Sequence, residues 1–421
     1  MESPILGELL GKGTFGKVYR IKDNKQAIKY VTSDKITGLS ELGELANLKR
    51  FDHPYILKCE GFTINRYKIG IILPLASGDI HDTIDKCKDR ITHVVLTEWF
   101  YQIISAVYFL HKNGFYHCDI KPQNILFIHD KVVLADLGLL GKKDMPMNGW
   151  CQSYPSPQLL YSRSDVKQVL NIPAVFKLPS NEYQDDVWAL GQTFYLMMPD
   201  LRHYLKVNIN SYSNFIADRR NVLIKSNVPS MYIPLLMVLL EADPAKRSIS
   251  LISLLDLDLF SNKKHLVDGN IVEVHNPRQV VFGDKSAFKH VLDTLLTAFK
   301  KIAVIDGDLV IQACDLLYRT YEFIAPLSTS EALKNYVNTI LLVVLKINKR
   351  TVQHPLIPAT PAMLKNEIDF VKWTNGHLSR KLISDFIKPD KYKIFINWLR
   401  ANPEKYEQYD ISQLTTLING L

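Results

Sequence analysis

One short stretch constrains this 421-residue chain more than any other feature. It reads His117-Cys118-Asp119-Ile120-Lys121-Pro122-Gln123-Asn124, and Asp136-Leu137-Gly138 follows it. Two carboxylates, an amide and a lysine therefore lie close together in sequence. Carboxylate and amide oxygens suit Mg²⁺, and a carboxylate beside a lysine can orient a hydroxyl group next to a transferred phosphoryl group. The pattern indicates phosphoryl transfer, with Asp119 at the hydroxyl, Lys121 near the phosphoryl group, and Asn124 and Asp136 on the metal.

A glycine-rich segment near the start of the chain fits the same chemistry. Gly11-Lys12-Gly13-Thr14-Phe15-Gly16-Lys17-Val18 separates two expected strands, and its glycines let the backbone approach the phosphates of ATP. Ala27-Ile28-Lys29 follows on a third strand and places one lysine at those phosphates. Glu44, on the expected helix Leu39–Phe51, is the natural ion-pair partner of Lys29.

Taken together, these motifs resemble the eukaryotic-type serine/threonine protein kinases from about residue 5 to about residue 260. The resemblance implies ATP and Mg²⁺ as cofactors and protein substrates phosphorylated on Ser or Thr. It implies Lys29, Glu44, Asp119 and Lys121 as catalytic residues, Asn124 and Asp136 as metal ligands, and Asp186 as a brace for the catalytic loop. The implied ATP-binding residues are Gly11, Gly13, Gly16, Val18, Ala27, Lys29, Leu73, Pro74, Ala76 and Leu126.

The fold class expected from the patterning is α+β, a bilobal kinase fold followed by an all-helical domain. Short turn-bounded strands are expected at Ile5–Gly11, Lys17–Lys22, Gln26–Val31 and Tyr67–Leu73, and residues 95–260 are mostly helical. We expect a kinase domain at 1–262, a linker at 263–284 and the helical domain at 285–421.

The C-terminal helical domain has expected helices at 286–304, 308–322, 328–348, 360–374 and 378–388. Their number and spacing resemble a cyclin box, and a generic helical bundle stays open as the alternative. A cyclin-like domain would dock in cis on the Leu39–Phe51 helix and keep Glu44 turned toward Lys29. This intramolecular contact would activate the kinase without phosphorylation.

The chain departs from the cyclin-dependent kinases, which the Glu44 helix and the hinge region resemble most. Cys118 replaces an arginine that receives the activation-loop phosphate, and two further arginines of that pocket fall at Gly43 and Gly141. The phosphorylated residue itself falls at Pro146. Without guanidinium groups a phosphate gains little from binding there, so we expect activity that does not depend on phosphorylation of this loop.

The end of the activation segment also differs from the family pattern. Ser156-Pro157-Gln158 stands for Ala-Pro-Glu, so the usual ion pair with Arg247 becomes a hydrogen bond between a neutral and a charged group. Pro155 occupies the position of an arginine that helps cyclin-dependent kinases select proline after the target residue. Proline-directed specificity is therefore not expected.

Composition narrows the partners and the compartment. The formal net charge is +8, with Lys and Arg interspersed rather than massed, so no nucleic-acid partner is expected. Five cysteines without paired spacing favour free thiols in a reducing compartment. The start shows no leader, and the longest apolar run, Thr339–Ile347, is too short to span a bilayer. We expect a soluble protein of the cytoplasm or nucleus with no membrane partner; such compact, divergent kinases resemble those of large DNA viruses.

Two other functions remain possible interpretations. A pseudokinase scaffold would explain the drift at Cys118, Leu137 and Gln158, but the retained catalytic and metal-binding residues argue against it. A small-molecule phosphotransferase is disfavoured by the complete glycine loop and by the closing motif at Asp243-Pro244.

Overall fold

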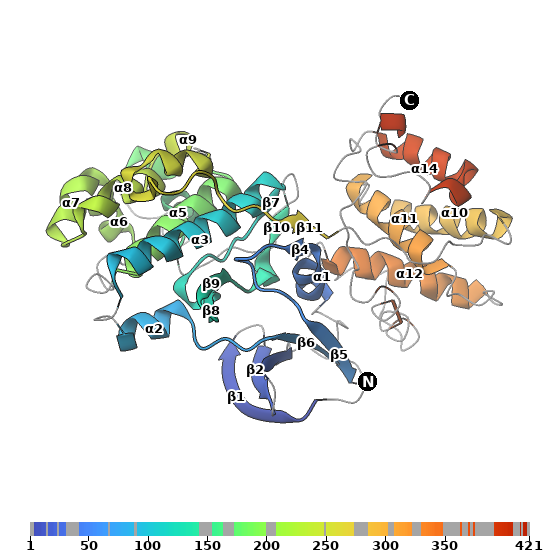
Figure 1. Cartoon of the computed structure of the whole chain (residues 1–421). Coiled ribbons are helices and arrows are strands. Elements are labelled where there is room, and N and C mark those ends of the chain that lie inside the picture. The colour runs from blue at the N-terminus through green and yellow to red at the C-terminus, as the bar shows by residue number, and fades with distance from the viewer. Residues whose placement is uncertain are drawn as a thin grey trace. The chain divides into compact units, whose positions relative to one another are not determined.

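The computed structural model of the chain describes residues 4–13, 16–22, 25–30, 42–65, 68–87, 91–142, 154–162, 172–198, 208–247, 250–272, 285–301, 307–321, 330–347, 363, 369–370, 374, 391–406, 413 and 416–418. These residues form two compact units (Figure 1). The first unit comprises residues 1–52, 58–74 and 271–421, and the second comprises 53–57 and 75–270.

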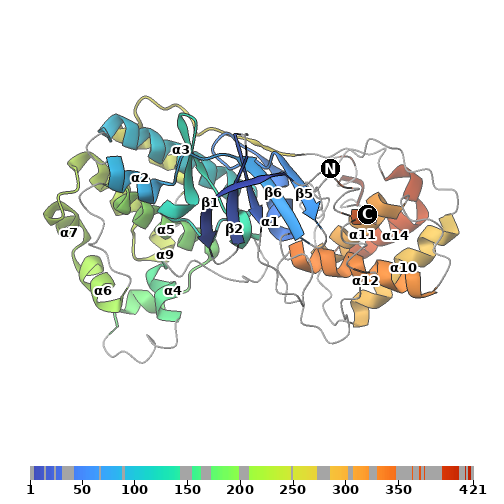
Figure 2. The same ribbon diagram turned by 90° about the horizontal axis from the view of Figure 1, so that it is seen from below.

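A five-stranded antiparallel sheet forms the N-terminal part of the first unit, in the order β1-β2-β3-β6-β5 (Figure 2). Its strands are β1 (Leu6–Gly13), β2 (Gly16–Ile21), β3 (Gln26–Tyr30), β5 (Gly61–Asn65) and β6 (Lys68–Pro74). The four expected strands are therefore present, although Val31 and Tyr67 lie outside the described residues. Strand β5 was not predicted. The register of β3 on β6 sets Ala27 opposite Leu73 and Lys29 opposite Ile71.

The first unit also holds the helix that carries Glu44 and the C-terminal helices. Helix α1 (Leu42–Arg50) leads into β4 (Phe51–Asp52), and the start of the expected helix at 39–41 lies outside the described residues. The C-terminal helices are α10 (Lys285–Lys301), α11 (Gly307–Tyr321), α12 (Ser330–Ile347) and α14 (Tyr392–Ala401), followed by the 3-10 turn Pro403–Lys405. Helices α10, α11 and α12 pack on one another, and α14 packs on α11.

Three of the five expected C-terminal helices match α10, α11 and α12 within a few residues. The expected helix at 360–374 is described at only four positions, 363, 369, 370 and 374, and the one at 378–388 lies outside the described residues. Helix α14 was not predicted. Its packing on α11 buries Phe395 and Leu399, so tertiary contact stabilises a short helix that sequence periodicity did not single out.

The second unit is mostly helical. Its longer helices are α2 (Ile80–Cys87), α3 (His93–Lys112), α5 (Glu182–Leu196), α6 (Ile209–Ala217), α7 (Arg219–Lys225) and α8 (Ile233–Leu239); α4 (Pro157–Ser162) and α9 (Pro244–Arg247) are short. Two small antiparallel ribbons join β7 (Phe115–Tyr116) to β10 (Gly141–Lys142) and β8 (Ile125–Ile128) to β9 (Lys131–Leu134). The second unit ends at Asn270, the first residue of the short strand β11 (Asn270–Ile271). The 3-10 turns are Pro122–Asn124, Leu137–Leu139, Ala174–Lys177, Ser230–Tyr232, Leu251–Asp256 and Asp258–Phe260.

Two helices form the core beneath the site. Helix α3 begins at the N-cap Thr92, whose hydroxyl accepts from the Val95 N–H at 3.3 Å, and its buried face includes Phe100. Helix α5 begins with a capping box between Asn181 and Gln184, and Phe194 on α5 stacks on Phe100 with ring centroids 4.1 Å apart. The α3–α5 core gives the catalytic loop a rigid support.

Candidate active site

The predicted pair of Lys29 and Glu44 is present in the first unit. Lys29 Nζ, on β3, lies 2.7 Å from Glu44 Oε1 on α1, and both side chains are largely buried. A lysine placed this way can present its ammonium group to a phosphate while the glutamate fixes its direction. Because the pair is shielded from water, removal of one partner would leave a poorly solvated charge.

The glycine-rich segment forms the turn between β1 and β2. Gly13 pairs with Gly16 across the turn, and Thr14 and Phe15 lie outside the described residues. Gly16 has φ 153°, a backbone conformation that residues with a Cβ rarely adopt. A Cβ placed on Gly11 would meet no atom of the described residues within 4 Å, so among these residues the backbone faces open space. This leaves room for a phosphate-bearing ligand.

The remaining predicted ATP-binding residues divide between the two units. Ala27 and Leu73 pair on adjacent strands of the first unit and are buried, and Pro74 ends β6. Val18 on β2 pairs with Lys29 on β3. In the second unit, Leu126 on β8 forms a β-bridge with Asp79.

The segment that contains Ala76 is tied to the strand that carries Leu126. Ser77 N–H donates to the Phe127 carbonyl at 3.0 Å, and Phe127 N–H donates to the Gly78 carbonyl at 2.9 Å. Ala76 and Leu126, both predicted to bind ATP, therefore lie on two segments that are joined by backbone hydrogen bonds.

The catalytic loop brings Asp119, Lys121 and Asn124 together around one carboxylate. Lys121 Nζ donates to Asp119 Oδ2 at 2.7 Å, and Asn124 Nδ2 donates to the same oxygen and to the Asp119 carbonyl, both at 2.8 Å. The first residues of this loop are buried, and the Asp119 carboxylate is 95% buried. The kinase resemblance implied roles for all three residues, and here they form one hydrogen-bonded cluster in which Asp119 has a fixed direction.

The two predicted metal ligands are connected through the backbone. Ala135 N–H donates to the Asn124 carbonyl at 2.8 Å, which brings the next residue, Asp136, beside Asn124. Asp136 has φ 59° and accepts weakly from Gly138 N–H at 3.4 Å. A Cβ on Gly138 would lie 2.9 Å from Asp136 Oδ1, so only glycine fits without displacing the carboxylate.

The chemistry of this donor set suits magnesium. Asn124 uses its Nδ2 donors on Asp119, which leaves Oδ1 as an acceptor, and Asp136 contributes a carboxylate. Mg²⁺ is held in proteins by one or two such oxygens together with water and substrate phosphate. The described residues contain no group of three or more His, Cys, Asp or Glu that would form an all-protein metal cage.

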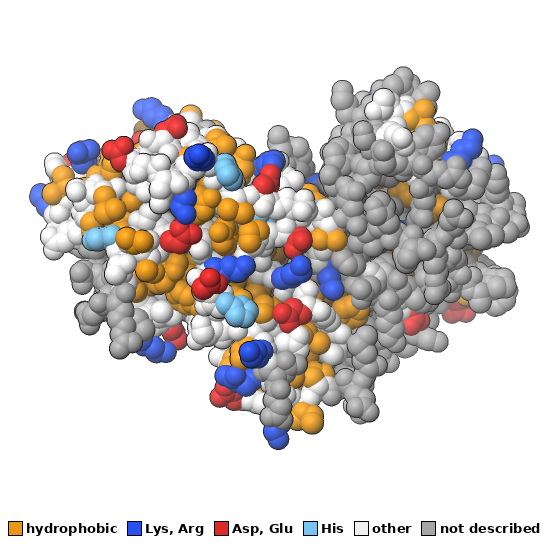
Figure 3. All heavy atoms as spheres, in the orientation of Figure 1, with side chains coloured by type: hydrophobic (Ala, Val, Ile, Leu, Met, Phe, Trp, Pro, Cys, Tyr) orange, Lys and Arg blue, Asp and Glu red, His pale blue; other side chains and the backbone are white. Residues whose placement is uncertain are grey.

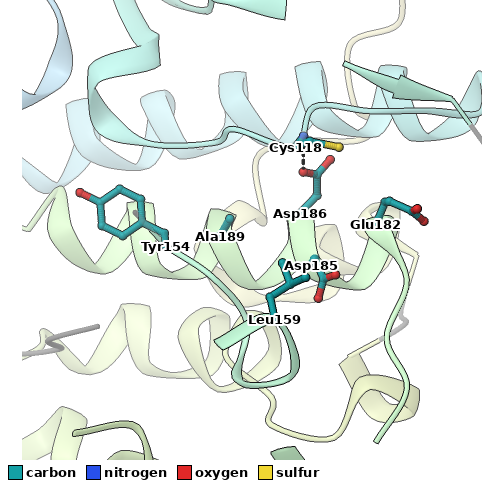
Figure 4. A pocket seen from close by; sticks show the side chains of 7 residues that line it. All are labelled: Cys118, Tyr154, Leu159, Glu182, Asp185, Asp186 and Ala189. Atoms are coloured by element: carbon teal, nitrogen blue, oxygen red, sulfur yellow. Dashed lines mark hydrogen bonds between the residues drawn. The ribbon is translucent and has the colours of Figure 1, made fainter. Parts of the chain in front are cut away.

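Asp186 at the start of α5 braces the catalytic loop, as the family resemblance implied. Its carboxylate accepts from the backbone N–H group of His117 at 2.7 Å. It also accepts from the Cys118 N–H group at 2.8 Å (Figure 4). His111 Nε2 also lies 3.0 Å from Asp186 Oδ2, an interaction that the sequence analysis missed. Nothing in the spacing of His111 on α3 pointed to it.

His117 is structural rather than catalytic. Its Nδ1 accepts from Asp119 N–H at 3.2 Å, so its Nε2 carries the proton and donates to the Ala135 carbonyl at 3.0 Å. Complete burial lowers the pKa of His117 below its usual value, which keeps the ring neutral. His117 is therefore a core histidine.

Two positions of the expected phosphate pocket lie side by side. Cys118 has φ 62°, and its thiol lies 3.6 Å from the Tyr116 carbonyl. Strand β10 places Gly141 opposite Tyr116, and a Cβ on Gly141 would be 3.3 Å from Cys118 Sγ. Cys118 and Gly141 are therefore neighbours, as two arginines of one phosphate pocket would be. Pro146 lies outside the described residues.

The end of the activation segment is anchored by residues of which sequence analysis identified only part. Arg247 is fully buried, and its Nη2 donates to Gln158 Oε1 at 2.8 Å. This is the expected hydrogen bond between a neutral and a charged group. Ser156 Oγ donates to Asp185 Oδ1 at 2.6 Å, and Arg247 Nη2 lies 4.0 Å from the same oxygen. Burial raises the pKa of Asp185 to about 6 and lowers the pKa of Arg247 to about 10. Asp185 was not predicted, because its role depends on tertiary burial.

The surface gives only general information about partners. On the face in Figure 3, Lys and Arg side chains are scattered among acidic and apolar ones. Within the part of the chain that the structure describes, no helix is long and apolar enough to cross a membrane.

Comparisons with known proteins agree with this site. The protein kinase domain family matches residues 5–256. NUAK family SNF1-like kinase 1 of Homo sapiens is 33% identical over 207 residues, which is 46% of this chain and 29% of that protein. CBL-interacting protein kinase 15 of Oryza sativa subsp. japonica is 28% identical over 208 residues, 47% of this chain and 46% of that protein.

These relatives correct part of the sequence interpretation. They are NUAK and CBL-interacting kinases of mammals and plants, so they support neither the expected closeness to cyclin-dependent kinases nor a viral source. The chain spans less than half the length of each relative. The family match covers more than half of the chain and ends before the C-terminal helices. The chain belongs to the protein kinase family.

Proposed function

We propose that the chain is an ATP- and Mg²⁺-dependent serine/threonine protein kinase. The observation that carries this proposal is the cluster in which Lys121 and Asn124 both bond to the Asp119 carboxylate. A lysine two residues after the catalytic aspartate resembles the serine/threonine branch of the family, and a relative in Arabidopsis thaliana is named a serine/threonine-protein kinase. The substrates would be Ser and Thr hydroxyls of proteins.

The geometry assigns a task to each side chain. Asp119 Oδ1 is free of the bonds made to Lys121 and Asn124 through Oδ2, so it can accept the proton of the attacking hydroxyl. Lys121 can neutralise charge on the transferred phosphoryl group, and Lys29 can hold the phosphates from the first unit. Asn124 Oδ1 and Asp136 would hold Mg²⁺, which would neutralise charge on the phosphate oxygens.

Transfer of labelled phosphate to a Ser/Thr peptide library tests this proposal. Asp119→Asn should lower transfer by at least about 10³-fold, because the residue that accepts the hydroxyl proton is lost while the shape is kept. Asp130→Asn, an exposed aspartate on the β8–β9 turn, is the matched control and should keep wild-type transfer. If wild type and Asp119→Asn are equally inactive under conditions in which ATP binds, the chain is a pseudokinase scaffold instead.

We further propose that the C-terminal helical domain, cyclin-like or not, activates the kinase in cis without phosphorylation of the activation loop. Support comes from the first compact unit, where α12 is a neighbour of α1, the helix that carries Glu44. Residues 339–345 of α12 are buried on every side, so α12 needs partners beyond α10 and α11. Of the residues of α1, Lys49 alone is not buried.

Two variants separate this control from phosphorylation. Val344→Asp should lower activity at least about tenfold by disrupting the packing of α12, whereas Lys334→Asp, at an exposed position of the same helix, should not. A Ser153→Ala/Tyr154→Phe double variant should keep its activity, because no phosphate on those residues is needed. Full activity of Val344→Asp would contradict control in cis.

A cytoplasmic or nuclear location remains part of the proposal. Cys59 and Cys314 are free and buried, which fits a reducing compartment. Mass spectrometry of alkylated protein from cells would contradict this if these thiols were found in disulfides.

A further inference from the structure

The buried positive charge of Arg247 has an unusual set of partners. Its Nε, Nη1 and Nη2 groups donate to the Gln184 carbonyl, the Glu241 carbonyl and Gln158 Oε1, at 2.8, 2.6 and 2.8 Å. All three acceptors are neutral. Among the described residues, the carboxylate that forms an ion pair with Arg247 is that of Asp185, whose Oδ1 lies 4.0 Å from Nη2. A fully buried guanidinium needs such a charge nearby.

The surroundings of residue 158 do not suit the glutamate that the family pattern has at this position. Gln158 Nε2 donates to the Val175 carbonyl at 2.8 Å and to the Ala242 carbonyl at 3.0 Å. A glutamate there would set an oxygen against these two carbonyl oxygens. The surroundings of Gln158 are thus complementary to an amide. Among the carboxylates that act on Arg247, which also include Glu241 and Asp243, Asp185 on α5 has the largest effect.

The same carboxylate also holds the activation segment. Ser156 is fully buried, and its hydroxyl donates to Asp185 Oδ1 at 2.6 Å while accepting from Leu159 N–H at 3.1 Å. Leu160 N–H donates to the Ser156 carbonyl at 2.8 Å, which begins α4. Asp185 therefore links Arg247 to the first turn of α4. Figure 4 shows Asp185 and Leu159 close together along the wall of a cavity whose lining also includes Cys118 and Tyr154.

We propose that Asp185 is a positioning residue that has taken over, from position 158, the anchoring of the activation segment. Its carboxylate supplies the counter-charge of Arg247 and holds Ser156. The segment end so fixed includes Pro155, whose carbonyl accepts from the Tyr212 hydroxyl at 2.9 Å. This inference rests on the proposed kinase function and adds what positions its peptide substrate.

A pair of serine variants tests the anchor with a matched control. Ser156 and Ser180 both donate to the Asp185 carboxylate, to Oδ1 at 2.6 Å and to Oδ2 at 3.3 Å, but only Ser156 belongs to the activation segment. Ser156→Ala should raise the KM for a peptide substrate about tenfold, with the KM for ATP changed less than about twofold. Ser180→Ala should leave both near wild type. Equal effects of the two variants would overturn the proposal.

Asp185→Asn tests the charge, since asparagine keeps the shape and an acceptor for Ser156. Its peptide KM should rise about tenfold near neutral pH. In the wild type the peptide KM should rise as the pH falls below about 6, where Asp185 takes up a proton, while Asp185→Asn should lack this change. The charged groups that face Asp185 are Arg247 on α9 and Asp186 on α5, and neither is altered in this comparison. A wild-type peptide KM in Asp185→Asn would overturn the proposal.

Hydrogen exchange keeps this inference separable from the proposed function. The amides of Leu159 and Leu160 should exchange at least about tenfold faster in Ser156→Ala than in Ser180→Ala, whether or not the protein transfers phosphate. An inactive wild type that still shows this difference would refute the kinase proposal alone. Unchanged exchange in Ser156→Ala would refute the anchor.

Discussion

Gly138→Ala is expected to impair metal use without destabilising the fold. A Cβ at this position would lie 2.9 Å from Asp136 Oδ1, where ordinary van der Waals contact begins at 3.4 Å, so the carboxylate or the backbone must move by about 0.5 Å. A displacement of about 1 Å at a reacting centre costs on the order of 10²-fold in rate, so about half of it should cost on the order of tenfold. The affected oxygen belongs to a predicted Mg²⁺ ligand.

The assay is phosphate transfer to a peptide as a function of Mg²⁺ concentration. We expect the apparent KM for Mg²⁺ to rise about tenfold and kcat to fall about tenfold. The free energy of unfolding should change by less than about 1 kcal/mol, because Gly138 is not among the described glycines with positive φ, which are Gly16, Gly78 and Gly114.

Gly141→Ala is the matched control. Its Cβ would meet Cys118 Sγ at 3.3 Å, a small overlap with a side chain outside the metal site, so its Mg²⁺ dependence should stay within about twofold of wild type. If Gly138→Ala shows the wild-type Mg²⁺ dependence, the assignment of Asp136 to the metal is refuted.

Three further outcomes follow from buried charges. Glu44→Gln should raise the ATP dissociation constant about tenfold or more, measured by calorimetry, since Lys29 loses the carboxylate at 2.7 Å; an unchanged constant would exclude the role of the pair. Asp315→Asn should lower the free energy of unfolding of the C-terminal helices by about 3 kcal/mol in urea melts, because it removes the carboxylate that lies 2.8 Å from Nε of the buried Arg319. Asp185 has a pKa raised from 3.8 to about 6, so its contribution to stability is complete below about pH 4 and is lost as the pH rises through 6. Relative to Asp185→Asn, the wild type should lose up to about 3 kcal/mol over that window; a constant difference between the two would contradict the raised pKa.

Sequence reasoning succeeded where the functional groups are local. Asp119, Lys121 and Asn124 lie within six residues, so their side chains can meet around one carboxylate through local contacts, as the family pattern implied. Lys29 and Glu44 come from different elements, but the family pattern supplied their pairing, and the structure bears it out. Both sets of contacts can therefore be predicted without knowing the rest of the fold.

It failed where burial decides the role of a residue. Asp185 stands beside Asp186 in sequence, and the family resemblance assigned a role to Asp186 alone. In the structure Asp186 holds the backbone of the catalytic loop, while Asp185 faces Ser156 and Arg247. His111 was missed for the same reason, because its contact with Asp186 joins α3 to α5 across the core.

The charges around Cys118 bear on how such a kinase could be controlled. Seven described residues line the cavity at Cys118, and they include Glu182, Asp185 and Asp186 but no lysine or arginine. A phosphate group brought there would carry close to two negative charges toward carboxylates, and it would lose hydration without gaining a guanidinium partner. With Gly141 beside Cys118, no side chain at that position can supply the missing cation. Phosphorylation at this pocket would therefore destabilise the activation segment. We accordingly assign control of the kinase to the contacts of α1 and the anchoring of the activation segment to Asp185.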